Sequence, residues 1–396
     1  MQIPRVPYVV LMGGWLALWG IAAASVAGQT AAADEWRLRF AAGEEARKAG
    51  DAATYASEME AAARAIPAGQ LNRPLFQYLA ARAAALQGQP EVAAEWLRTA
   101  WDEGIESLMI SFARFDPAFA SMAGTPPFEG VMQLMADMDL EVRSLAGTTH
   151  LVSGAGANVL AQVGNDGVLL VDTGYRPALP ALRRVLATVG AGQVDLLLLT
   201  HPHEDHMGSA ASLGASATVL AHPGTTAGMT QPYEFMDGVN LPPKAPTALP
   251  DIEILSDTSF VFNGETVHVV PTVAHTAGDL SVYFEGSRVA HFGDTYLAGN
   301  PMMFPGSQDP AGFLDRMDAF IGMMHPETVV VGGHESVTDL ASVRAQIEMS
   351  RACMAYVQGA FSDGLTIEET AQQGSDRFPV PWIAFFYGYF AANAEG

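Results

Sequence analysis

Residues 200–208 read Thr-His-Pro-His-Glu-Asp-His-Met-Gly and bring three imidazoles and a carboxylate into one short loop. Neutral imidazole and carboxylate are good ligands for divalent zinc. The loop directly follows an apolar run with four leucines, which predicts a buried strand. Because alternate residues of an extended segment share a side, His201 and His203 can reach one metal ion. Asp205 and His206 lie past the turn and can face a second ion, although a plain histidine-rich surface loop is the alternative.

Four further polar residues stand where strand-like runs end. His275 follows the apolar residues 267–273, and Asp294 comes shortly after another strand-like stretch. His334 ends the string Val-Val-Val-Gly-Gly-His, and Asp172 ends Val-Leu-Leu-Val-Asp. A sheet presents such side chains along one rim, where loops carry function. The sequence therefore predicts that distant segments complete the metal site.

In their order and context these motifs resemble those of metallo-β-lactamase-fold hydrolases, over roughly residues 148–340. The resemblance implies an α/β fold, an αββα sandwich that holds two zinc ions per chain. It also implies a ligand set: His201, His203 and His275 for the first ion, Asp205, His206 and His334 for the second, and Asp294 as the bridge. Asp172 would orient a ligand imidazole, as such partners do. Its alternative role is to cap the following turn.

The chemistry of such a site is hydrolysis. Two zinc ions share a water and lower its pKa, so hydroxide can attack a carbonyl carbon or a phosphorus. Asp205 is expected to aim that hydroxide as a catalytic residue. We find no Gly-x-Ser-x-Gly motif that would indicate a serine nucleophile. Tyr296, two residues after Asp294, is the candidate oxyanion donor, and a tyrosine of the core or of the site wall is the alternative.

Asp294 is the residue that discriminates between the branches of this fold. β-Lactamase branches generally lack a bridging aspartate, so the resemblance favours a small ester, thioester or lactone as substrate. A β-lactam-hydrolysing enzyme is the alternative, and an inactive helical-repeat binding protein is the alternative of another class. Iron in place of zinc is a further alternative. Glyoxalase II itself is disfavoured, because its glutathione site uses basic residues near the C-terminus and only Arg344, Arg351 and Arg377 follow His334.

The start of the chain and its charge restrict where it works and what it binds. Residues 1–28 match a signal peptide, which predicts a periplasmic or secreted protein with no membrane span after cleavage. An uncleaved membrane anchor is the alternative. The net charge of −23 argues against nucleic-acid binding, which needs Lys and Arg on phosphate. The single cysteine, Cys353, excludes an intrachain disulfide.

Helical patterns flank the catalytic segment. Residues 34–145 are rich in Ala, Glu, Leu and Arg, and their Gly-containing breaks recur near a tetratricopeptide period. The pattern predicts helices over Asp34–Lys48, Ala52–Ala65, Pro74–Leu86 and Pro90–Trp101. We expect one to three tetratricopeptide-like repeats that could bind a protein partner, or else a plain helical bundle. Residues 147–340 form the predicted catalytic domain, and residues 341–396 a C-terminal helical extension packed on it. Residues 223–250, rich in Pro, Gly and Met, predict a long irregular insertion, either a lid over the metal rim or a surface loop.

Overall fold

The computed structural model describes residues 32–70, 72–105, 107–236, 239–296, 302, 309–334 and 337–394. The predicted signal peptide, residues 1–28, lies outside these ranges. The chain divides into two compact units. The first comprises Met1–Met138 and Gln231–Pro243, and the second comprises Asp139–Thr230 and Lys244–Gly396. Within the described residues, no helix is both long and apolar enough to cross a membrane.

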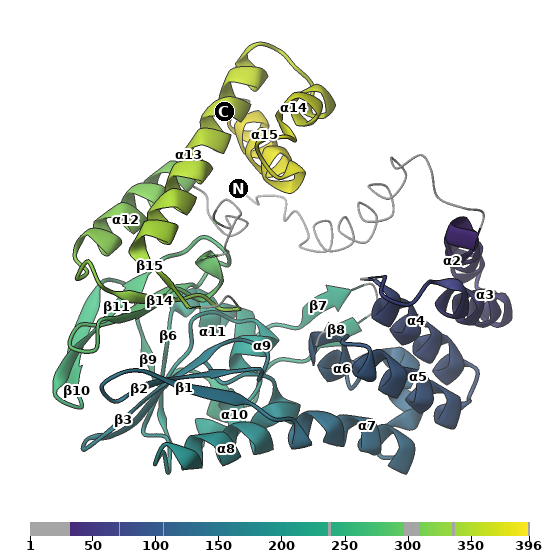
Figure 1. The fold of residues 1–396 in the computed structure, drawn as a ribbon, viewed down its shortest axis with the longest axis horizontal. Coiled ribbons are helices and arrows are strands. Elements are labelled where there is room, and N and C mark those ends of the chain that lie inside the picture. Colours follow the sequence, from purple (N-terminus) through teal and green to yellow (C-terminus); the bar gives the residue numbers. More distant parts are fainter. Residues whose placement is uncertain are drawn as a thin grey trace. The chain divides into compact units, whose positions relative to one another are not determined.

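The first unit is built from helices that pack against their neighbours in chain order (Figure 1). They are α2 (Ala32–Lys48), α3 (Ala52–Ala65), α4 (Arg73–Leu86), α5 (Pro90–Asp102), α6 (Ser107–Phe112) and α7 (Pro126–Asp137). Local signals define their ends: Asp51 accepts a hydrogen bond from the N–H of Thr54, as an N-cap residue does. The sequence predicted the first four helices to within two residues. Whether they are tetratricopeptide repeats stays a prediction.

A buried ion pair joins two parts of this unit. Asp116 accepts hydrogen bonds from Arg82 Nε at 2.6 Å and from the Tyr78 hydroxyl at 3.2 Å. It also accepts one from the N–H of Ala118 at 2.9 Å, which caps the short helix Pro117–Met122. The polar groups around the Asp116 carboxylate therefore compensate its burial.

Within residues 223–250, where the sequence predicted an irregular insertion, many of the described residues form regular elements instead. This segment contains α11 (Pro223–Met229) and a two-stranded hairpin of β7 (Tyr233–Met236) and β8 (Val239–Leu241). Hydrogen bonding along the hairpin satisfies backbone groups that an irregular loop would leave to solvent. The hairpin belongs to the helical unit, whereas α11 belongs to the second unit. The chain therefore passes between the units at three points, after residues 138, 230 and 243.

The second unit is a sandwich of two sheets. The first sheet has the order β1-β2-β3-β4-β5-β6-β9. Its strands are β1 (Glu141–Ala146), β2 (Thr149–Ser153), β3 (Val159–Gly164), β4 (Gly167–Val171), β5 (Leu196–Leu198), β6 (Thr218–Ala221) and β9 (Ile252–Glu253). The second sheet runs from β10 to β15 in sequence order. Its strands are β10 (Thr258–Phe262), β11 (Glu265–Pro271), β12 (Leu280–Phe284), β13 (Val289–His291), β14 (Val329–Val331) and β15 (Thr338–Asp339).

Helices cover the outer faces of both sheets, so the unit has the predicted αββα layers (Figure 1). The inner faces share one apolar core, to which Leu160 and Leu198 contribute from the first sheet and Val267 and Val282 from the second. On the first sheet lie α8 (Leu179–Thr188) and α10 (Ala210–Leu213). On the second lie α12 (Pro310–Gly322), α13 (Leu340–Ser362) and α15 (Val380–Ala394), with α14 (Ile367–Gly374) between the last two in sequence. The sequence placed the start of this domain at residue 147, but its first strand, β1, already begins at Glu141.

Strand direction gathers the polar chain segments at one rim. β4, β5 and β6 are parallel, and β13 and β14 are parallel in the other sheet. The carboxyl ends of parallel strands meet at the same edge of a sheet. Asp172 follows β4 and His201 follows β5 in the first sheet, while Asp294 and His334 follow β13 and β14 in the second.

Candidate metal centre

The loop after β5 turns at once into the short helix α9 (Glu204–Met207), with His203 as its N-cap residue. The N–H of Leu199 still bonds to Leu220 of β6, so the loop leaves a strand that is held in the sheet. His201 is 1% exposed and His206 is fully buried. The one turn of helix places Asp205 and His206 past the bend, and the centroids of the His206 and His201 rings lie 4.0 Å apart.

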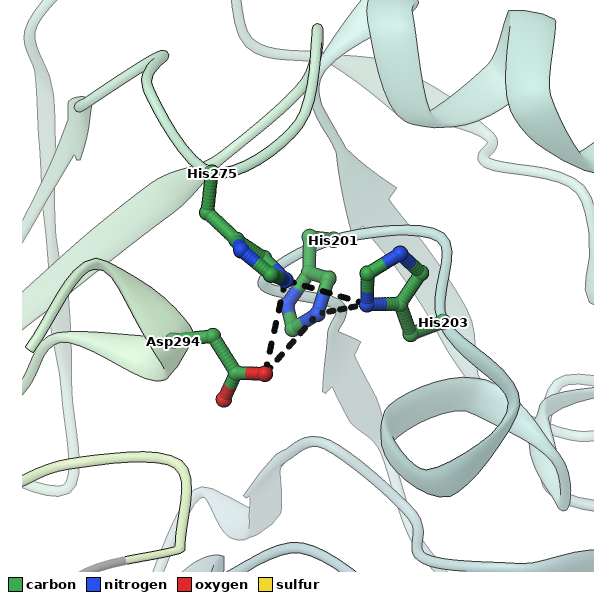
Figure 2. Close-up of side chains that lie close together, drawn as sticks. All are labelled: His201, His203, His275 and Asp294. Carbon is green, nitrogen blue, oxygen red and sulfur yellow. Dashed lines mark hydrogen bonds and ion pairs between the residues drawn. The ribbon is translucent and has the colours of Figure 1, made fainter. Parts of the chain in front are cut away.

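Four residues from three chain segments form the first ligand group: His201, His203, His275 and Asp294. Figure 2 shows the three rings turned toward one another, with the Asp294 carboxylate beside them. His203 Nδ1 lies 3.0 Å from His201 Nε2 and 3.0 Å from His275 Nε2. Asp294 Oδ2 lies 3.4 Å from His275 Nε2 and 3.7 Å from His201 Nε2. One ligand atom from each residue can therefore face a common point.

The second ligand group consists of Asp205, His206 and His334. Asp205 Oδ2 lies 3.0 Å from His334 Nε2 and 3.5 Å from His206 Nε2. The other oxygen of Asp294 faces this group, because Oδ1 lies 3.1 Å from His206 Nε2 and 3.5 Å from His334 Nε2. Asp294 thus presents one carboxylate oxygen to each group, which is the arrangement a bridging ligand needs.

Buried atoms without partners test whether metal ions fit here. His206 Nε2 and Asp294 Oδ1 are buried and lie 3.1 Å apart, but neither makes a hydrogen bond with the other or with another residue that the structure describes. Leaving such groups unsatisfied costs free energy, so native structures rarely do it without a reason. The same atoms belong to a set of imidazoles and carboxylates suited to divalent zinc. The donor set therefore fits two metal ions, one for each ligand group.

The two groups differ in their protonation. Burial lowers the pKa of His201 and His203 and lowers that of His275 to about 3, so these rings are neutral, the form that binds metal. In the second group, burial would also lower the pKa of His334, but the Asp294 and Asp205 carboxylates outweigh it and raise that pKa to about 10.

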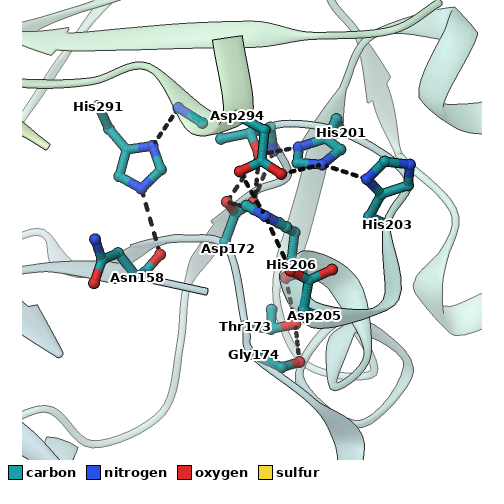
Figure 3. Close-up of polar contacts among 12 residues, drawn as sticks. Asn158, Asp172, Thr173, Gly174, His201, His203, Asp205, His206, His291 and Asp294 are labelled. Atoms are coloured by element: carbon teal, nitrogen blue, oxygen red, sulfur yellow. Dashed lines mark hydrogen bonds and ion pairs between the residues drawn. The ribbon is translucent and has the colours of Figure 1, made fainter. Parts of the chain in front are cut away.

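Asp172 fixes the orientation of the His206 ring, as the resemblance implied. Its Oδ2 lies 2.7 Å from His206 Nδ1 (Figure 3), and its two oxygens accept hydrogen bonds from the N–H and hydroxyl of Thr200 at 2.8 Å. Nδ1 is thereby engaged, which leaves Nε2 to face Asp205 and Asp294. The φ of Asp172 is 64°, a left-handed conformation that Asp and Asn adopt more readily than most residues. Asp172 also accepts hydrogen bonds from Thr200, which begins the loop of residues 200–208 (the metal loop), so it does more than cap a turn.

A buried network that the sequence did not reveal holds the loops of the second sheet. Asn158 donates from its backbone N–H to Gly333 O at 2.6 Å and from its side chain to Gly332 O at 2.9 Å. His291 Nε2 lies 3.3 Å from Asn158 O, and its Nδ1 accepts the N–H of Gly293 at 3.0 Å (Figure 3). One network thus supports the residues directly before His334 and Asp294. A single histidine in a strand gives no signal of partners distant in sequence, so the pattern around His291 did not indicate this network.

Two close approaches shape the same loops. A Cβ on Gly333 would lie 1.9 Å from Asp294 Oδ1, so only glycine allows the chain to pass so near the bridging carboxylate. Asp279 organises the loop of His275 by accepting hydrogen bonds from the N–H groups of Ala274 and Thr276, each at 2.8 Å. The loops that carry ligands are therefore held by their own backbone contacts.

Tyr296 lies away from this pattern. Its side chain is 3% exposed and belongs to the apolar core that the second sheet shares with α12 and α13. None of the contacts of the described residues joins Tyr296 to either ligand group. Its position agrees with the alternative of a core tyrosine, and its role as oxyanion donor stays a prediction.

Comparison with known proteins accounts for this geometry. The family model of the metallo-beta-lactamase superfamily matches residues 153–334, which include all seven predicted ligands. These residues form a metallo-β-lactamase domain. A double mutant of a sec-alkyl sulfatase from a Pseudomonas species superimposes on 66% of this chain and 52% of its own, with a TM-score of 0.51 at 16% identity. That likeness shows the fold of the metallo-β-lactamase domain.

The curated relatives are hydroxyacylglutathione hydrolases. That of Acidiphilium cryptum (strain JF-5) is 28% identical over 165 residues, which are 41% of this chain and 60% of the relative. That of Fuscovulum blasticum is 26% identical over 187 residues, 47% of this chain and 63% of the relative. The chain thus spans less than two thirds of the length of these relatives.

Proposed function

We propose that this protein is a metal-dependent hydrolase that holds two zinc ions and cleaves an ester, thioester or lactone-type substrate. The observation that carries the proposal is the Asp294 carboxylate, which turns one oxygen to each ligand group. A carboxylate placed in this way is suited to hold two cations beside each other. The orphaned Nε2 of His206 supports the same conclusion, because a metal ion would satisfy it.

The residues of the chain would divide the work. The chemistry that zinc supplies in such a site is polarisation of a carbonyl and activation of a water nucleophile. His201, His203 and His275 would bind as neutral rings. Asp205 would accept a hydrogen bond from the attacking water and so aim it at the carbonyl carbon. Asp172 would keep the His206 ring in its binding orientation through the contact at 2.7 Å.

The relatives support a thioester or ester as substrate. Hydroxyacylglutathione, which the names of these curated relatives give as substrate, is a thioester, and cleavage of its C–S bond releases a good leaving group. A thioester of glutathione is a poorer candidate substrate for this chain. Of the three arginines after His334, Arg351 pairs with Asp315 and Asp318, and Arg377 lies over the ring of Tyr356. We therefore favour acyl thioesters and esters without the two carboxylates of glutathione.

The test is a substrate panel on purified full-length protein that has been stripped with a chelator and reloaded with zinc. We expect about two zinc ions per chain by elemental analysis. A neutral acyl thioester, an aryl ester and an acyl lactone should be cleaved with higher kcat/KM than a penicillin or a cephalosporin. Reloading with iron or manganese in parallel identifies the most active metal. A β-lactam that turns over faster than every ester-type compound would replace this proposal with the lactamase alternative. Absence of metal binding would favour the inactive binding protein.

A further inference from the structure

Glu204 is a buried carboxylate inside the metal loop that is in neither ligand group. It stands between His203 and Asp205, one ligand candidate from each group, and its side chain is 4% exposed. Its carboxylate contacts the ammonium group of Lys244, whose side chain is 17% exposed. An ionised carboxylate at this depth needs a partner, because burial penalises its charge. Lys244 supplies that partner from 40 residues further along the chain.

Lys244 is itself fixed by the backbone. Its N–H donates to Met229 O at 2.8 Å, which closes the base of the insertion that carries the β7–β8 hairpin. Residues 231–243 belong to the first unit, and Lys244 is the first residue after them that belongs to the second unit. The backbone of Lys244 is therefore held by α11, while its ammonium group contacts Glu204 in the loop of residues 200–208.

Glu204 also starts the helix that separates the two ligand groups. It is the first residue of α9, which has a single turn and no side-chain cap. A helix this short has little stability of its own, so contacts from elsewhere must hold it. Among the described contacts of α9, the ion pair is the one that ties its first residue to a distant segment. Buried ion pairs add little to stability compared with apolar packing, but they can specify one geometry.

We propose that the Glu204–Lys244 pair is a positioning device, which holds α9 so that His203 and Asp205 face their separate metal ions. The inference rests on the proposed function, since it concerns the metal site of that function. Lys244 and Glu204 touch neither substrate nor metal in this role and act only through the two ligands that flank Glu204.

The test is cobalt binding to the full-length chain, followed by visible absorption and by competition with a chelator of known affinity. The variants are Lys244→Met, Glu204→Gln and the conservative Lys244→Arg. We expect Lys244→Met and Glu204→Gln each to weaken cobalt binding by about 10-fold and to change the cobalt spectrum, the scale of effect known for groups that orient ligands. Lys244→Arg keeps the ion pair and should restore both properties.

Opposite charge changes separate positioning from a simple field effect. Lys244→Met removes a positive charge, which through the field alone would tighten cation binding, whereas Glu204→Gln would loosen it. Positioning predicts weaker binding in both variants. Tighter or unchanged cobalt binding in Lys244→Met, with an unchanged spectrum, would overturn the proposal. If that variant does not fold, a wild-type spectrum and affinity in Glu204→Gln would overturn it as well.

A matched control exists in the helical unit. Arg82 and Asp116 form a pair with side chains 18% and 0% exposed, similar in burial to Lys244 and Glu204. Arg82→Met should lower thermal stability but leave the cobalt spectrum unchanged. If the wild-type chain binds two cobalt ions but hydrolyses none of the panel, the proposed function fails while the positioning result stands. If the wild-type chain binds no cobalt, both fail.

Discussion

The Arg82–Asp116 pair of the helical unit and the seven-residue ligand set of the metallo-β-lactamase domain are both buried, yet their polar groups are satisfied differently. Around Asp116, a guanidinium, a hydroxyl and a backbone N–H all donate to one carboxylate. In the ligand set, three imidazoles face one another, and atoms such as His206 Nε2 have no hydrogen-bond partner among the described residues. The first arrangement is complete without any ligand, whereas the second is suited to bound cations. Satisfaction of buried polar atoms thus separates a structural cluster from a functional one.

The largest effect that tests this difference between the two clusters should come from removing one member of the ligand set. We expect His203→Ala and Asp205→Ala each to lower kcat/KM by at least about 100-fold, because each removes a primary ligand. Metal content by elemental analysis should fall in parallel. Cooperative unfolding should remain, since the strands of the sandwich do not depend on these side chains. Near-normal turnover in either variant would show that the loop is not the metal site.

A smaller effect should follow from Asp172→Asn. Asparagine also tolerates the φ of 64°, so the backbone should be retained while the charge that orients His206 is lost. Loss of such a partner costs between about 10- and 100-fold in activity or metal affinity. Kinetics with a zinc titration would measure both quantities. An Asp172→Asn enzyme equal to wild type in both would reduce the role of Asp172 to the turn and strand contact with Thr200.

The helical unit should respond in the opposite way. Arg82→Met leaves the buried Asp116 carboxylate without its main cation, and we expect the free energy of unfolding to fall by about 2 kcal/mol. This is below the usual cost for fully buried pairs because Arg82 is partly exposed. Turnover and metal content should not change. Urea unfolding followed by circular dichroism, beside zinc analysis, would decide, and a loss of metal would contradict the structural role of this pair.

The smallest effect is expected at the surface of the same unit. Lys48 and Glu45 pair at 2.8 Å, but their side chains are mostly exposed. Solvent and salt screen such pairs, so Lys48→Gln should leave both thermal stability and turnover unchanged within error. A clear fall in melting temperature would mean that ion pairs stabilise this acidic chain whatever their burial, and the contrast between the two buried clusters would lose its meaning.

The sequence by itself indicated the candidate ligands and most of the elements. Ligand residues such as His201 and His334 stand directly after apolar strands, so short-range order alone indicates where they emerge. Helix α3 has the predicted bounds because its cap and its following break are local signals. Residues 153–334, matched by the family model, lie within the predicted catalytic segment.

Only the tertiary structure decided how these residues are held. Asn158 and His291 meet although 133 residues separate them, and Glu204 meets Lys244 across 40. The two oxygens of Asp294 turn to different ligand groups because both sheets end at the same rim. The β7–β8 hairpin belongs to the helical unit although its sequence lies inside the catalytic segment. Such contacts depend on packing between distant segments, which the periodicity of a single segment does not encode. A ligand residue that follows its own strand can instead be predicted from the sequence of that segment alone.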